Sequence, residues 1–222
     1  MIGIVTSGRK KAKNFMSMEE YKKQFKEELG INPYAGTLNI LSPYKKILEE
    51  MDGIMVRGFI RKGKKYGGVK CFPVKIGRLK AAIVIPEKSK EEYLEIISKH
   101  NLREKLQLKD GDKIKIKFIP FLKWRRKYLL DCEEGEKKAR IKIYYENPLL
   151  KNPLIEGCEE RKGNKVLPSR IVASMIFEGN EKENFKKLLT WTKKRYSIMY
   201  PPILIDYGQL KEWQLEIKWN TA

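Results

Sequence analysis

The sequence predicts a mainly β N-terminal domain, arranged as a barrel, followed by a small α+β C-terminal domain. Residues 1–119 contain many short runs of β-branched and aromatic residues separated by turn residues, with few helical patterns. Near Pro120 the character of the chain changes, because basic and aromatic residues lead there into a polar stretch. The length of 222 residues suits two ordinary domains better than one large core. We therefore predict domains at residues 1–119 and 120–222.

The first elements are a strand and an amphipathic helix. Residues 2–8 form an apolar run that ends in glycine, which predicts a short strand followed by a basic loop. Ser17 and Glu20 have the spacing of a capping box, and apolar side chains then recur at helical spacing until Gly30. We therefore expect a helix that is capped by Ser17 and ends at Gly30.

The pattern from there to Phe118 is mostly β, with short strands bounded by glycine and proline turns. The expected elements, in order, are an extended segment at 37–40, a short helix at 43–51, a hairpin over 54–80 that turns at 62–65, a strand at 81–85, a helix at 90–100 and, after a turn at 110–111, a strand at 114–118. Many short strands with few helices are typical of a barrel.

The C-terminal part combines strands with one basic helix. Strands are predicted at 139–145, 171–177 and 213–219, and a helix at 181–196 with a cap at Asn180 and Glu183. Basic and aromatic residues alternate in this helix around Trp191 and Tyr196, and again at 124–128. Such a mixture is typical of nucleic-acid contacts. Aromatic residues at helical spacing are equally typical of a core, and lysine runs of a solvated face, so both interpretations stay open.

The composition is that of a folded protein with a heavily charged surface. Hydrophobic residues make up 41% of the chain and charged residues 34%, which leaves enough apolar material for a core. The apolar runs are far shorter than the roughly 20 residues of a membrane-spanning helix, and the N-terminus lacks the apolar stretch of a signal peptide. We therefore expect a soluble protein of the cytoplasm, without a membrane partner.

The cysteines and the histidine exclude several kinds of site. Cys71, Cys132 and Cys158 are odd in number and far apart, which gives neither a disulfide framework nor the pair spacing of a zinc site. We interpret them as packing residues. His100 is the single histidine, so histidine metal clusters are excluded by count, and most Ser-His-Asp arrangements with them. We interpret His100 as a surface residue.

The net charge of +20 predicts an affinity for phosphate groups. The phosphate could belong to a nucleotide, a nucleic acid or an anionic surface. Enrichment in lysine and glutamate is also typical of proteins adapted to heat, in which exposed charges form networks. The charge therefore indicates the chemistry of a partner without identifying it.

The usual phosphate-transfer signatures are missing, since the sequence contains neither a Walker-type loop nor a Gly-x-Gly-x-x-Gly motif. The distinctive segment is instead the uncharged turn at residues 29–39. In an extended segment Thr37 and Asn39 face the same side, while Leu38 points into the core. A hydroxyl and an amide oxygen side by side suit Mg²⁺, which takes oxygen ligands and uses only one or two protein groups beside waters and phosphates. A tight turn in which the Asn side chain bonds local backbone is the alternative.

The first half of the chain resembles the archaeal CTP-dependent riboflavin kinases, over about residues 2–118. The resemblance rests on motifs that occur in one order: Ser7-Gly8, Phe15-Met16-Ser17, Leu29-Gly30, Pro33-Tyr34-x-Gly36-Thr37-Leu38-Asn39, Gly68-Val69-Lys70, Ala82-Ile83-Val84-Ile85-Pro86, Glu95-Ile96-Ile97, Leu102-Arg103-Glu104 and Leu108-Lys109-Asp110-Gly111-Asp112. No family is recognised for residues 121–222.

The resemblance implies a fold, a reaction and a set of site residues. The fold would be a six-stranded barrel of the cradle-loop type, and the reaction the phosphorylation of riboflavin by CTP to give FMN and CDP. Thr37 and Asn39 would be the magnesium ligands. Residues on the nucleotide would be Gly8, Arg9, Lys10, Lys11, Ala12 and Lys13 at the phosphates and Asn101, Leu102, Arg103 and Glu104 at the cytidine. Ser89 and Glu95 would contact riboflavin, although a helix cap and a solvated helix residue are their ordinary interpretations.

The phosphate loop departs from the family pattern, which usually includes a second glycine and an acidic residue. In this chain the loop contains lysines instead. Their point charges would bind the triphosphate in place of the exposed backbone N–H groups of a glycine-rich loop. We hypothesise that Lys11 or Lys13 stabilises the charge that moves to the acceptor hydroxyl. The change could also mean that the site takes another phosphorylated ligand. The segment between Pro86 and Glu95 is shorter than the family pattern, which bears on the riboflavin contacts.

Two other functions stay open at this stage. The barrel could retain only ligand sensing, in a regulatory protein whose basic C-terminal domain binds nucleic acid. A kinase of the same fold could instead act on another small alcohol, which the altered loop permits.

Overall fold

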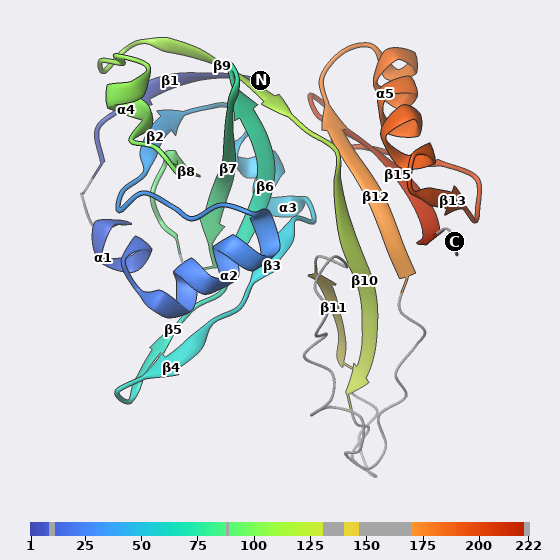
Figure 1. Cartoon of the computed structure of the whole chain (residues 1–222), viewed down its shortest axis with the longest axis horizontal. Helices are drawn as coiled ribbons and strands as arrows, with labels where there is room; N and C mark the ends of the chain where they lie inside the picture. Colours follow the sequence, from blue (N-terminus) through green and yellow to red (C-terminus); the bar gives the residue numbers. More distant parts are fainter. Residues whose placement is uncertain (9–11, 88, 131–139, 147–169, 220–222) are drawn as a thin grey trace.

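The computed structural model describes residues 1–8, 12–87, 89–130, 140–146 and 170–219. It consists of a closed β-barrel and a second antiparallel sheet that lie side by side (Figure 1). The chain passes from the barrel to the second sheet between Phe118 and Phe121. Among the described helices, none is long and apolar enough to cross a membrane.

Six antiparallel strands form the barrel, in the spatial order β6-β7-β8-β2-β1-β9. Their bounds are β1 (Ile2–Thr6), β2 (Leu38–Leu41), β6 (Val69–Ile76), β7 (Leu79–Pro86), β8 (Leu94–Ser98) and β9 (Lys113–Phe118). Pairing of β6 with β9 closes the cylinder. The short β3 (Ile54–Val56) extends the start of β6, and β4 (Phe59–Arg61) and β5 (Lys64–Tyr66) form a separate hairpin. The predicted six-stranded barrel is confirmed.

Alternating side chains explain why these segments are strands. In β9 the lysines at 113, 115 and 117 face solvent, while Ile114, Ile116 and Phe118 enter the core. The helix α2 (Glu19–Leu29) covers the barrel with Tyr21, Phe25 and Leu29, which recur at helical spacing and are all buried. The barrel and its covering helices therefore share one continuous apolar core.

The end of α2 agrees with its prediction, whereas its start does not. Gly30 has a left-handed conformation, with φ of 61°, and its N–H donates to the Lys26 carbonyl. The predicted capping box at Ser17 is wrong, because the Ser17 hydroxyl donates to the Asn14 carbonyl. Asn14 belongs to a preceding helix, α1 (Ala12–Met16), and the Ser17 N–H donates to the Lys13 carbonyl, so Ser17 continues the last turn of α1 and α2 is preceded by Met18 instead.

The helix predicted at 90–100 is also wrong, because the segment contains strand β8 instead. Its charged start has the composition of a helix, but Leu94 and Ile96 are buried and β8 pairs with both β7 and β2. These tertiary pairings override local propensity. The difference matters for the site, because it places Glu95 on the barrel wall beside Asn39 of β2.

Two more short helices lie beside the barrel. The predicted helix at 43–51 corresponds to α3 (Lys45–Glu50). The α4 helix (Leu102–Lys105) was not predicted. Its N-terminus is capped by Asn101, whose side-chain oxygen accepts from the Glu104 N–H at 3.4 Å.

The second unit has the predicted α+β character. Its strands are β10 (Phe121–Leu130), β11 (Arg140–Glu146), β12 (Arg170–Phe177), β13 (Tyr196–Ile198), β14 (Ile203–Asp206) and β15 (Lys211–Trp219). The helix α5 (Glu181–Lys193) packs on this sheet through the buried Leu188, and the predicted cap is confirmed, since Asn180 accepts from the Glu183 N–H at 3.0 Å. Tyr196 is buried in the same cluster and the half-buried Trp191 packs against it, so both aromatic rings contribute to the packing of this unit.

The two units share packed residues, which fixes one against the other. Phe121, Ile176 and Leu210 of the second unit belong to the barrel's apolar cluster. Lys123 and Glu212 form a fully buried ion pair at 2.7 Å, and Lys123 also donates to the Asp52 carbonyl. Division of the chain into domains at residue 120 stays a prediction.

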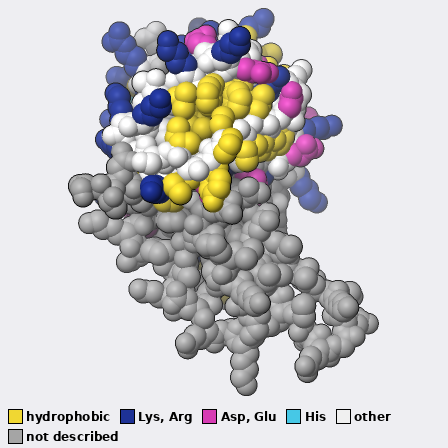
Figure 2. Space-filling model, turned by 90° about the vertical axis from the view of Figure 1, so that its right-hand side faces the viewer, with side chains coloured by type: hydrophobic (Ala, Val, Ile, Leu, Met, Phe, Trp, Pro, Cys, Tyr) yellow, Lys and Arg dark blue, Asp and Glu magenta, His cyan; other side chains and the backbone are white. Residues whose placement is uncertain are grey.

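The outer face of the second unit carries an apolar patch bordered by charged side chains (Figure 2). Among the side chains that the structure describes in this unit, the exposed large hydrophobic ones are Ile198, Met199, Tyr200 and Ile203.

Cys71 is fully buried in the barrel, as its interpretation as a packing residue requires, and burial raises the pKa of its thiol. Cys132 and Cys158 lie outside the described residues.

Candidate functional site

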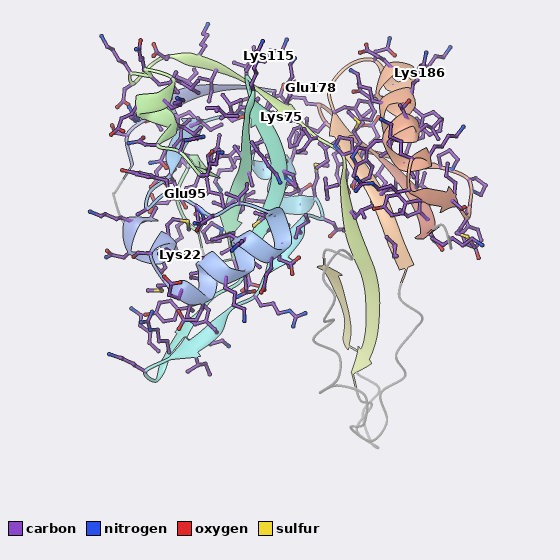
Figure 3. All side chains as sticks on the ribbon, in the orientation of Figure 1. Lys22, Lys75, Glu95, Lys115, Glu178 and Lys186 are labelled. Atoms are coloured by element: carbon purple, nitrogen blue, oxygen red, sulfur yellow. The ribbon has the colours of Figure 1, made fainter. Side chains whose placement is uncertain are left out.

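A cavity of about 960 Å³ opens into the barrel between the end of β1, α1, β2, β8 and α4. Within the described ranges, every residue that lines it lies between Ser7 and Arg103 and so belongs to the barrel unit. Figure 3 shows Glu95 of this wall in the barrel and Lys186 on α5 of the second unit, far apart in the view. The candidate site is therefore built by the N-terminal half of the chain.

Most of the predicted site residues meet in this one cavity. The predicted residues that line it are Gly8, Ala12, Lys13, Thr37, Asn39, Ser89, Glu95, Asn101, Leu102 and Arg103. Glu104 is exposed and does not line the cavity. Arg9, Lys10 and Lys11 lie outside the described residues. Segments far apart in the sequence are thus brought together as the predicted site requires.

Three side-chain oxygens converge on the cavity wall where β2 and β8 pair. The Thr37 hydroxyl lies 3.0 Å from Asn39 Oδ1 and 3.3 Å from Glu95 Oε1. Leu38, between the two polar residues, is buried, as the alternation of an extended segment requires. The hydroxyl has one hydrogen and the other two oxygens are acceptors, so the group has more lone pairs than protons to share. Such an oxygen set fits a hard cation such as Mg²⁺.

No cluster of three or more His, Cys, Asp or Glu side chains that could hold a metal occurs among the residues with described positions. The protein oxygens available to a cation at this cavity wall are those of Thr37 and Asn39, with the Glu95 carboxylate beside them. This donor set suits Mg²⁺, which keeps most of its ligands as waters and phosphate oxygens.

Gly8 lies directly against Asn39, one of the two residues that could hold a metal ion. A Cβ atom built on Gly8 would stand 2.0 Å from Asn39 Nδ2 and 3.1 Å from the Tyr93 hydroxyl. No other residue type fits there while Asn39 keeps its orientation. The glycine therefore lets the start of the basic loop lie directly against the Asn39 amide, whose oxygen faces Thr37.

Glu95 is a half-buried carboxylate with a perturbed pKa. Burial raises the pKa above the ordinary glutamate value, the hydrogen bond from Thr37 opposes that rise, and the charge of Glu91 adds to it. The folded protein therefore binds this proton more tightly than the unfolded chain does. Its contribution to stability is present below the ordinary pKa of about 4.3 and is lost as the pH rises through the raised value.

We expect Glu95→Gln to unfold at a higher temperature than the wild type at pH 7, by a few degrees, because a neutral amide avoids the cost of a buried charge. The difference should shrink toward zero below about pH 4. Thermal unfolding at both pH values measures it. Glu27→Gln, at an exposed position of α2, is the matched control. A lower unfolding temperature of Glu95→Gln at pH 7 would contradict the assignment.

In the segment after β8, the side chains of Asn101 and Leu102 are occupied by helix capping and by core packing. Leu102 is buried, with 3% of its surface exposed, so its side chain packs in the core. Asn101 uses its side chain to cap α4. Ser89 lines the cavity, but its hydroxyl accepts from the Glu91 N–H at 3.4 Å, in a turn rather than at a helix cap.

Several cavity residues were missed by reasoning from the sequence. His100 was interpreted as a surface residue, yet it is half-buried and lines the cavity. Phe15 and Tyr66 also line it, with ring centroids 6.4 Å apart, and Tyr66 stacks on Phe59 at 5.0 Å. In the sequence, the run Tyr66-Gly67-Gly68, an aromatic residue followed by two glycines, is the feature that could have pointed to this wall of the cavity.

Comparison with known families identifies the unit that holds this cavity. Residues 5–118 match a family model named for CTP-dependent riboflavin kinase (CTP-dep_RFKase) and described as a domain of unknown function, DUF120. The chain belongs to this family. The match begins within β1 and ends at the last residue of β9, so it covers the barrel except for the start of β1, includes the whole described cavity lining and stops before the second sheet.

Curated relatives in the riboflavin kinase family come from archaea. The chain is 41% identical to a riboflavin kinase of Archaeoglobus fulgidus over 124 residues, which cover 53% of each protein. It is 37% identical to a riboflavin kinase of Pyrobaculum aerophilum over 126 residues, 54% of this chain and 60% of the relative. A riboflavin kinase of Ignicoccus hospitalis is 39% identical over 121 residues, 51% of this chain and 68% of the relative. The chain thus spans between about half and two thirds of the length of these relatives.

Proposed function

We propose that this protein transfers the terminal phosphate of CTP to riboflavin, giving FMN and CDP, with Mg²⁺ as the metal. The observation that carries the proposal is the convergence of Thr37, Asn39 and Glu95 oxygens in one cavity that also contains Gly8 and the α4 segment. The names of the relatives supply the substrate, and the name of the family model supplies the nucleotide. The activity of the whole chain rests on these together.

The nucleotide would lie between the basic loop and α4. Lys13 reaches the cavity from α1, and the loop before it adds Arg9, Lys10 and Lys11 to the same segment of the sequence. These cations offset the charge of a triphosphate. Backbone groups of Asn101 and Leu102 would recognise the cytosine, since their side chains are committed to a helix cap and to the core.

Thr37 and Asn39 would hold the magnesium ion, which when bound neutralises charge on the phosphates. The two side chains would fix where the phosphate chain ends, because both residues line the cavity from one extended segment. Phosphoryl transfer needs mainly alignment and charge stabilisation from the protein. Lys13, at the start of α1, and Lys11, in the basic loop before it, would stabilise the transferring group.

The acceptor alcohol would approach from the side of Glu95 and Ser89. Glu95 lies within 3.3 Å of the Thr37 hydroxyl, so a substrate hydroxyl bound to its carboxylate would stand beside the phosphate site. A raised pKa makes this carboxylate a better proton acceptor than an exposed glutamate. Phe15 and Tyr66 offer aromatic surface for the flavin ring.

The test is FMN formation by the purified protein from riboflavin and radiolabelled CTP with Mg²⁺. Parallel reactions contain ATP in place of CTP, a chelator in place of Mg²⁺, or other small alcohols in place of riboflavin. We expect FMN with CTP and much less product in the other reactions. Phosphate transfer to a different alcohol, with none to riboflavin, would contradict the riboflavin assignment and support the alternative kinase.

The nucleic-acid alternative gains nothing from the described residues. Tyr196 is a core residue and Trp191 packs against the same cluster, so the two aromatic side chains serve the packing of this unit and only Trp191 keeps part of its surface exposed for base stacking. Retention on RNA or DNA at physiological salt, in the absence of FMN formation, would revive it.

A further inference from the structure

One carboxylate outside the cavity joins two of its walls. Asp110 follows α4 in the turn before β9. Its Oδ2 accepts from the Ser7 hydroxyl at 2.6 Å, and its Oδ1 accepts from Arg103 at 2.6 Å. A second nitrogen of the same guanidinium donates to the Thr6 carbonyl at 2.8 Å. These contacts form a closed set, which we call the Asp110 clasp.

Both partners of Asp110 belong to the nucleotide end of the cavity. Ser7 lines it and directly precedes Gly8, where the basic loop begins. Arg103 lines it from α4, but two of its nitrogens are committed to protein acceptors. Asp110 itself is not part of the lining. It would therefore act through Ser7 and Arg103.

The main chain holds the same turn independently of the Asp110 side chain. The Val5 N–H donates to the Asp112 carbonyl at 2.8 Å, and the Gly111 N–H donates to the Val5 carbonyl at 2.9 Å. Loss of the carboxylate should thus leave the turn attached to β1. What it removes is the lateral restraint on Ser7 and on the Arg103 guanidinium.

The electrostatics agree with this geometry. The hydrogen bond from Ser7, followed by that from Arg103, lowers the pKa of Asp110, so the carboxylate is charged throughout the physiological range. Bonds to a charged acceptor are stronger and more directional than neutral ones. The Arg103 and Asp110 side chains remain 34% and 51% exposed, so solvent weakens the pair and its role as a fold stabiliser is small.

We infer that Asp110 is a positioning residue for the nucleotide: through Ser7 and Arg103 it sets the distance between the start of the phosphate loop and α4. The inference rests on the proposed function. Because the clasp lies at one end of the cavity, its loss should weaken the binding of CTP and leave riboflavin binding unchanged. Glu95 and Ser89, at the other end, make no contact with the clasp in the described hydrogen bonds and ion pairs.

The test compares Asp110→Ala with the wild type by calorimetric titration of CTP and of riboflavin, and by steady-state kinetics. We expect the Kd and KM for CTP to rise about tenfold, the effect of losing charge-assisted bonds at a partly exposed site. Riboflavin affinity, kcat and thermal stability should stay near wild-type values. Asp110→Glu, which keeps the charge, should restore part of the CTP affinity. Equal weakening of both ligands, or unchanged CTP affinity, would overturn the inference.

Asp112→Asn is the matched control, because Asp112 lies in the same turn and accepts from the Lys109 N–H at 2.7 Å without touching Ser7 or Arg103. It should leave CTP affinity unchanged. Amide hydrogen exchange of Thr6, Ser7 and Gly8 in the ligand-free protein gives a second readout, and it should accelerate in Asp110→Ala alone. A wild type that binds no CTP overturns the proposed function, whereas normal CTP binding by both the wild type and Asp110→Ala overturns only the clasp.

Discussion

Replacement of both Thr37 and Asn39 by alanine should lower CTP-dependent FMN formation by about 10³-fold while the barrel remains folded. Loss of metal-assisted charge stabilisation is worth several kcal/mol in phosphoryl transfer, and ~4 kcal/mol corresponds to that factor. The fold should tolerate the change because the two side chains bond mainly to each other and to Glu95, at the wall of an open cavity. Measured kcat/KM and thermal unfolding of the double variant test both statements.

The control variant also replaces one threonine and one asparagine by alanine, at positions where no ligand is expected. Thr190→Ala with Asn184→Ala removes a hydroxyl and an amide from α5 of the second unit, far from the cavity. Turnover of this control should equal that of the wild type. If the Thr37 and Asn39 variant turns over normally, the magnesium assignment and the proposed mechanism are both wrong.

Gly8→Ala should reduce kcat/KM by about 10²-fold with little loss of stability. Loss of the Asn39 oxygen as a cation ligand and displacement of the loop would together cost a few kcal/mol of transition-state stabilisation. The new methyl group would lie 2.0 Å from Asn39 Nδ2, so the Asn39 side chain must rotate. Its oxygen then leaves Thr37. Rotation of one amide at a cavity wall costs the fold little, and kinetics together with thermal unfolding would separate the two effects.

A double-variant cycle is the sharpest control for Gly8. In an Asn39→Ala background the added methyl group meets no amide, so Gly8→Ala should cause little further loss of kcat/KM. Full additivity of the two substitutions would mean that Gly8 acts on the nucleotide without involving Asn39. The cycle therefore distinguishes a steric effect of residue 8 on the Asn39 side chain from a direct contact between the Gly8 backbone and phosphate.

The relative orientation of the Thr37 and Asn39 side chains could be predicted because it depends only on the chain near them. Thr37 and Asn39 are two residues apart in an extended segment, and such a segment turns both side chains to one face. The structure has this arrangement, with Leu38 buried between them. The short alternating strands and the left-handed Gly30 were predictable for the same reason, since alternation and turn chemistry are local properties. The six-stranded closure of the barrel was implied by the resemblance to the riboflavin kinase family.

The position of Glu95 could not be predicted in this way. The charged residues before it favoured a helix, and only pairing with β7 and β2 makes the segment a strand. Hydrogen bonds between strands depend on partners far away in the sequence, so a short window cannot weigh them against local propensity. The same holds for His100, which lines the cavity only because α4 and β8 fold around it.

The sequence by itself determined the alternating short strands of the barrel, the shared face of the Thr37 hydroxyl and the Asn39 amide oxygen, and the strongly basic character of the chain. Tertiary structure alone decided that Gly8 contacts Asn39, that Glu95 joins the pair, and that Asp110 holds Ser7 and Arg103. Periodicity and turn residues act over a few positions, where the covalent chain fixes the geometry. Except for the Arg103–Asp110 pair, these contacts join residues about 30 to 100 positions apart, and they depend on the packing of the whole barrel, which no local pattern records.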